Sequence, residues 1–175
     1  MKKRHGHDWA VWLKDFILGA QDGIVSNLAL VLGVAVATWS DRIVIISGIS
    51  AALGEAISMA AVAYTSTETA GAYYKSEKKT AVPKEYTSPM FSAWMVGLSN
   101  ILGSAMALLP FFFLPIEMAI FGAIILCGLT LFLTGVFKAK FTHGNWFRSG
   151  TELLTIGFVA AAAGYVIGRI LGVAV

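Results

Sequence analysis

The sequence predicts an all-α, polytopic membrane protein with five transmembrane helices per subunit, on two observations. Of its 175 residues, 57% are hydrophobic and only 13% are charged, whereas about 25% of the residues in an ordinary soluble domain are charged. Five segments are also apolar enough to cross a bilayer core of about 30 Å, which needs roughly 20 residues in a helix. A chain of 175 residues suits one transmembrane domain, residues 1–175.

The five spans are expected at residues 16–38, 43–63, 90–109, 116–137 and 153–173. The first has a basic start and an Ala-Val-Ala stretch at 35–37 that looks like a signal-peptide cleavage site, but we expect it to be retained as a helix. The helical pattern of the second span continues toward Tyr74. Pro110 and Pro115 are expected to separate the third span from the fourth.

The Lys and Arg residues predict how the chain crosses the membrane. Eleven of the thirteen flank the N-terminus, the loop at 75–89 and the connection between the last two spans. Basic residues concentrate on the cytoplasmic side, so we expect a cytoplasmic N-terminus and a C-terminus on the opposite side. These residues lie at span ends and belong to no soluble domain, so no binding to nucleic acid is expected.

Two acidic residues, Asp22 and Glu55, lie inside predicted spans. The acids expected to be solvated, in flanks or loops, are Asp8, Asp15, Asp41, Glu77, Glu85 and Glu117. A charge at the bilayer centre costs about 3 kcal/mol on insertion scales, so such a residue is usually functional, the alternative being a structural hydrogen bond. Asp22 lies about 9 Å and Glu55 about 12 Å from the cytoplasmic surface at about 1.5 Å per residue. Antiparallel neighbouring helices would therefore bring the two carboxylates together.

The surroundings of these acids are typical of a metal site. Ser26 follows Asp22 by one turn, and Met59 follows Glu55 by one turn on the same face. Oxygen ligands alone suit Mg²⁺ or Ca²⁺, and a thioether shifts the preference toward a first-row transition ion. The predicted metal ligands are Asp22, Glu55, Met59 and, at the cytoplasmic mouth, Glu68, with Ser26 and Glu152 as weaker candidates.

Other residues carry less information. Cys127 lies in an apolar run and is expected to be a small buried residue, and His5, His7 and His143 are expected to be solvated. No nucleotide-binding or zinc-helix motif is present in the sequence, and no span holds a histidine for a catalytic dyad, so no enzyme is expected. A stripe of Gly19, Gly23, Ser26, Leu30 and Gly33 predicts close approach of another helix, foremost its copy in a second subunit.

Three stretches resemble the vacuolar iron transporter family: GAQDGIVSNLALVLGV at 19–34, ISGISAALGEAISMAAVAYTS at 46–66 and, more weakly, RSGTELLTIGFVAAAAGYVIG at 148–168. The resemblance covers nearly the whole chain. It implies five transmembrane helices per subunit, a homodimer, and exchange of Fe²⁺ or Mn²⁺ for protons. It also implies that ions pass between two subunits along the first helices, and that Asp22 and Met59 occupy metal-site positions.

The sequence departs from this family at two places. Many members have an acidic residue in a Gly-Glu-Tyr sequence shortly after the Ser-Met pair, where this chain has Ala63. We expect Glu55 to supply the missing carboxylate. The long acidic cytoplasmic insert of vacuolar members is also replaced by a short loop, which favours a prokaryotic plasma-membrane protein or, in a eukaryote, an organelle-membrane relative that lacks the insert.

The sequence therefore predicts a membrane protein that exports Fe²⁺ or Mn²⁺ from the cytoplasm in exchange for protons. No permanently bound cofactor is expected, because the metal is the transported substrate. Two alternatives stay open at this point: a metal-binding membrane module that does not transport, and a passive cation channel.

Overall fold

The computed structural model describes residues 4–76 and 88–172 of the chain, with side chains from residue 12 onward. Its elements are helices α1 (Arg4–Thr38), α2 (Asp41–Ser76), α3 (Pro89–Phe113), α4 (Ile116–Thr142) and α5 (Trp146–Leu171). Each of these five helices is long and apolar enough to cross a membrane. The described residues contain no strand. The predicted all-α fold with five transmembrane helices is therefore confirmed.

The third helix ends later than the sequence predicted, because Pro110 lies inside it and does not break it. Near the end of a helix a proline removes only one intrahelical bond, and here the N–H of Leu114 still donates to the carbonyl oxygen of Pro110 at 2.9 Å. The break comes at Leu114, whose backbone is extended. Since a proline disfavours the helical conformation of the residue before it, Pro115 is the residue that separates α3 from α4.

The fifth helix begins at Trp146, before the predicted start at 153. The cause is Asn145, whose side-chain oxygen accepts hydrogen bonds from the N–H groups of Phe147 and Arg148 at 3.0 and 3.2 Å. Such a cap satisfies backbone donors that the first turn leaves without partners. In the connection that precedes α5, helix α4 ends at Thr142, and His143 adopts a left-handed conformation with a φ of 54°.

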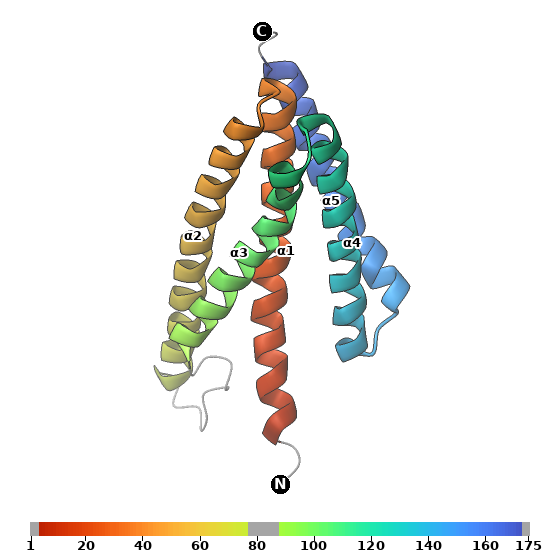
Figure 1. Cartoon of the computed structure of the whole chain (residues 1–175). Coiled ribbons are helices and arrows are strands. Elements are labelled where there is room, and N and C mark those ends of the chain that lie inside the picture. The colour runs from red at the N-terminus through yellow and green to blue at the C-terminus, as the bar shows by residue number, and fades with distance from the viewer. Residues whose placement is uncertain (1–3, 77–87, 173–175) are drawn as a thin grey trace.

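Helix α1 lies in the middle of the bundle and contacts each of the other four helices. Figure 1 shows α2 on one side of it and α4 and α5 on the other, while α3 runs obliquely across α1 from the side of α2 to that of α4. The helices converge at the end where α1 joins α2 and spread apart toward the N-terminal end of α1. The core lies around buried side chains such as Leu28, Val31, Leu108 and Leu131, and includes Cys127, which is buried as predicted.

The glycines of α1 pack against other helices of the same chain. A side chain at Gly19 or Gly23 would collide with the α3 backbone at Val96 or Asn100, and one at Gly103 of α3 would collide with Ala20. Gly33 lies against the backbone of Gly164 in α5. The stripe does permit close helix approach, but for its three glycines the prediction that a second subunit is the main partner is wrong, because α3 and α5 of the same chain already pack against them.

Candidate metal site between the first three helices

The two carboxylates inside the membrane lie together. The Ser26 hydroxyl lies 2.5 Å from Glu55 Oε1 and 2.5 Å from the backbone oxygen of Asp22, one turn earlier. The side chains of Asp22 and Glu55 are also near enough to interact directly. The depths counted along the sequence thus correspond to one cluster in the structure, with Ser26 linking α1 to α2.

The register of α1 against α2 is set nearby. The buried Asn27 side chain donates from Nδ2 to the backbone oxygen of Gly48 at 3.3 Å. Gly48 leaves no room for a side chain, because Leu108 of α3 and Val31 of α1 pack against it. Gly48 and Glu55 are seven residues apart, about two turns of one helix, so the same face of α2 meets α1 at both positions.

A third helix contributes a residue that sequence reasoning missed. Asn100 of α3 is 0% exposed. Its Nδ2 donates to Asp22 Oδ2 at 3.4 Å, and its amide also lies against the Glu55 carboxylate. One turn further on, the Ser104 hydroxyl donates to the backbone oxygen of Gly23 at 3.3 Å. The sequence does contain a sign of this role, because Asn100 is an amide inside an apolar span. A side-chain amide is unfavourable in hydrocarbon unless it has hydrogen-bond partners.

The cluster offers only oxygen atoms and one amide N–H₂. In the described part of the chain, no group of three or more His, Cys, Asp and Glu residues is placed to hold a metal ion. A cation at this site would therefore receive two carboxylates from one chain, and further ligands would be neutral groups or come from a second copy. Two neighbouring negative charges in a low-dielectric region are strongly stabilised by a divalent cation or by protons.

The remaining predicted ligands have different placements. Met59 is half-buried on α2, one turn from Glu55, and stays a predicted ligand. Glu68 is exposed, and it lies thirteen residues from Glu55, about 20 Å along the helix, so one ion cannot contact both. Glu152 is exposed on α5, beside Thr155 and Ile156. His143 is exposed as expected. His5, His7, Asp8, Glu77 and Glu85 lie outside the described side chains.

Asp15 corrects a second expectation. It was predicted to be solvated but is only 3% exposed. It lies one turn before Gly19, on the face of α1 that packs against α3, which explains its burial. Its carboxylate is 3.9 Å from the ammonium group of the neighbouring Lys14, whose side chain is largely exposed. Asp41, also expected in solvent, is half-buried, whereas Glu117 is exposed.

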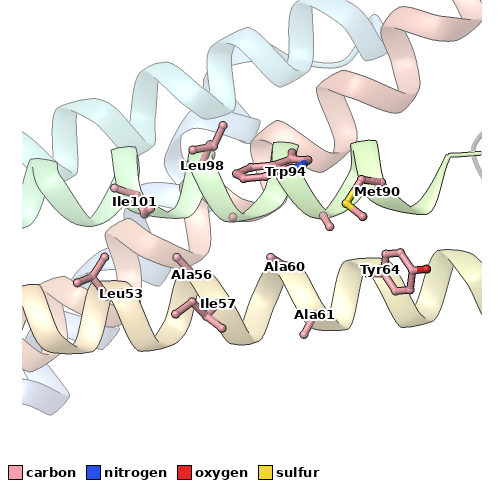
Figure 2. A pocket seen from close by; sticks show the side chains of 12 residues that line it. Leu53, Ala56, Ile57, Ala60, Ala61, Tyr64, Met90, Trp94, Leu98 and Ile101 are labelled. Atoms are coloured by element: carbon pink, nitrogen blue, oxygen red, sulfur yellow. The ribbon is translucent and has the colours of Figure 1, made fainter.

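The cavity between α2 and α3 is not at the carboxylates. It is a groove of about 410 Å³ between α2 and α3, lined only by apolar side chains and Tyr64 (Figure 2). Its α2 residues Ile57, Ala60 and Tyr64 lie roughly opposite Glu55 around a helix of about 3.6 residues per turn. The groove offers no ligand set for a cation, so it belongs to a different face of α2.

Comparisons with known proteins agree with the resemblance found in the sequence. The family model described as VIT family matches residues 13–82 and 78–169. Vacuolar iron transporter homolog 1 of Arabidopsis thaliana is 30% identical over 93% of this chain and 84% of its own length. Vacuolar iron transporter 1 of the same plant is 25% identical over 90% and 85%.

The similarity also extends to archaea. An uncharacterised protein of Methanocaldococcus jannaschii is 25% identical over 83% of this chain and 82% of its own length. The family match spans nearly all of the five-helix bundle, including both helices that carry the membrane carboxylates. This multi-pass membrane protein therefore belongs to the vacuolar iron transporter (VIT) family.

Proposed function

We propose that this protein transports a divalent transition metal, Fe²⁺ or Mn²⁺, and exports it from the cytoplasm in exchange for protons. The observation that carries the proposal is the pair Asp22 and Glu55, joined through Ser26 inside two membrane-spanning helices. The names of the relatives as vacuolar iron transporters support iron as a substrate.

Competition at the two carboxylates provides the coupling. A carboxylate binds either a metal ion or a proton. Two adjacent carboxylates inside a membrane are unfavourable when both are charged and unpaired, so we expect either an ion or protons to be bound there. Protons entering from one side would therefore displace the ion, and the ion would displace protons when it enters from the other. The site needs no nucleotide, because the energy comes from the ion gradients themselves.

A second copy of the chain completes the site in this proposal. Asp22, Ser26, Glu55 and Met59 are all only half-buried in one subunit. Half-exposed carboxylates facing lipid are unfavourable, and intramembrane charges usually face a bundle interior or a water-filled path. A homodimer with this face at its two-fold axis would offer four carboxylates and two thioethers. Because α3 and α5 already pack against the glycines of α1, the dimer contact would instead use the face that carries Asp22 and Glu55.

The topology and location are part of the same proposal. The distribution of Lys and Arg favours a cytoplasmic N-terminus in a cell membrane, and the plasma membrane of a prokaryote suits the short loop between α2 and α3. Single cysteines near Lys79 and Val175, introduced after replacing Cys127, should label from opposite sides of intact cells. Labelling from the same side would contradict this topology.

Flux into proteoliposomes tests the function. The purified full chain is reconstituted with a pH-sensitive dye inside the vesicles, and Mn²⁺ or Fe²⁺ is added outside. The proposal predicts metal uptake far above the number of protein copies, with protons moving the opposite way. Uptake that stops at one or two ions per protein would indicate a binding module, and uptake without proton movement would indicate a channel.

A further inference from the structure

Asn100 combines two properties that its packing alone does not explain. It is completely buried in α3, and its amide N–H₂ group points at the carboxylates of the candidate metal site. Its Oδ1 atom is buried and has no hydrogen-bond partner among the described residues. A buried acceptor without a partner destabilises the folded protein. A leucine at this buried position would leave no such acceptor.

A carboxamide is suited to a site that changes its charge state. It is the uncharged side chain that carries both a double N–H donor and a carbonyl acceptor. When the site holds no ion, the N–H₂ group stabilises the Asp22 carboxylate, as the 3.4 Å contact shows. When a cation is present, the same N–H₂ group would point its positive end at the ion, which is unfavourable.

We propose that the Asn100 side chain turns over when the ion binds and that its Oδ1 becomes a metal ligand. The final torsion of an asparagine side chain is broad and roughly two-fold, so this exchange requires no movement of α3. The oxygen that now lacks a partner would then coordinate the ion beside Asp22 and Glu55. This inference rests on the proposed function for the identity of the ion, but it concerns binding and not transport.

The chemistry of the ligand makes Asn100 a residue that determines specificity. Amide and carboxylate oxygens suit harder ions such as Mn²⁺, whereas thioether and other soft ligands favour Zn²⁺. If Asn100 is lost, a site of two carboxylates, Ser26 and Met59 loses affinity for Mn²⁺ more than for Zn²⁺. A purely structural role of Asn100 would weaken both ions alike.

The test is calorimetric titration of the purified full chain in detergent with Mn²⁺ alone and with Zn²⁺ alone. The variants are Asn100→Leu, which removes both amide functions, and Asn100→Asp, which keeps the shape and an oxygen ligand. Ser104→Ala, one turn away on α3, is the matched control for loss of a buried polar group. Asn100→Leu should weaken Mn²⁺ about tenfold or more, a typical loss when a group that supports a metal site is removed. Asn100→Asp should bind Mn²⁺ at least as tightly as the unmodified chain.

The outcomes separate this inference from the proposed function. An unchanged ratio of Mn²⁺ to Zn²⁺ affinity in Asn100→Leu, or a tenfold loss of Mn²⁺ in Asn100→Asp, would overturn the ligand role. If Asn100→Leu does not yield a monodisperse protein, the Mn²⁺ affinity of Asn100→Asp by itself decides whether Asn100 is a ligand. A chain that binds Mn²⁺ as predicted here but moves none across vesicles would refute the transport proposal and leave the ligand assignment standing.

Discussion

The two faces of helix α2 differ in both space and chemistry. One face carries Glu55, which meets Ser26 and Asp22 of α1 in a tight polar cluster. The opposite face lines the groove of about 410 Å³ against α3, where Ile57 and Ala60 contribute only apolar atoms (Figure 2). The groove thus offers no chemistry for an ion, and the polar site lies on the other face of α2, against α1.

The membrane explains this difference. An apolar groove on the outside of a bundle faces hydrocarbon, so its presence costs little and implies no ligand. A carboxylate pair inside the bilayer is costly, so its retention requires a function or a partner. In this protein the charged residues that are unfavourable in lipid therefore indicate the site better than the volume of the groove does.

The largest effect is expected from the carboxylates themselves. Asp22→Asn and Glu55→Gln should each nearly abolish metal-driven proton movement in proteoliposomes, because either change removes one of two charges that hold the ion. Since the change also removes repulsion between neighbouring carboxylates, the melting temperature without metal should stay equal or rise. Normal transport by Glu55→Gln would show that Glu55 does not replace the acid absent at Ala63.

A smaller effect is expected from Met59, which shares the face of Glu55. Met59→Leu keeps the volume and loses the sulfur, so it should weaken Fe²⁺ or Mn²⁺ about tenfold, or about 1.4 kcal/mol. Binding of Mg²⁺, which prefers oxygen ligands, should change much less. Competition between Mn²⁺ and Mg²⁺ in the same flux assay measures the ratio, and an equal loss for both ions would remove Met59 from the ligand set.

Glu68 lies beyond the span predicted at residues 43–63 and should have a still smaller effect. Its exposed carboxylate can attract cations to this end of α2 but cannot reach an ion at Glu55. Glu68→Gln should therefore raise the half-saturating metal concentration about two- to threefold at low salt, an exposed-charge effect that salt screens. The maximal rate should stay near that of the unmodified chain. A large loss of maximal rate instead would place Glu68 in the transport step.

The groove face should have no effect on the ion. Ala61 is exposed and lines the groove away from the carboxylates, so Ala61→Leu adds volume there without touching the site. Its metal uptake and proton movement should match those of the unmodified chain, in vesicles with equal amounts of protein. Loss of transport in this variant would mean that the two faces of α2 do not act independently.

The sequence predicted the fold and half of the site for identifiable reasons. Long apolar segments and the basic residues between them predict the helices, and counting along antiparallel spans brings Asp22 and Glu55 to one depth. Ser26 follows from helical spacing. The partner of the glycine stripe and the burial of Asp15 depend on which helix covers which face of α1, and spacing along one helix does not decide that.

Asn100 shows the same limit most clearly. Its position in α3 is visible in the sequence as a polar residue in an apolar span, but nothing in the spacing of α3 relates it to residues 78 positions away. Its place at the carboxylates follows from the close packing at Gly19, Gly23 and Gly103, which lets α3 approach the backbone of α1. Tertiary packing, and not local pattern, therefore completes the polar cluster.

A double-mutant cycle of metal binding tests the central claim, that Asp22 and Glu55 form a single site, most directly. The affinity for Mn²⁺ is measured by calorimetry for the unmodified chain, Asp22→Asn, Glu55→Gln and the double variant. Residues that act as a unit are not additive, so the double variant should bind hardly more weakly than either single variant. If the two losses of binding free energy simply add, the carboxylates bind separate ions, and the site described here is not one site.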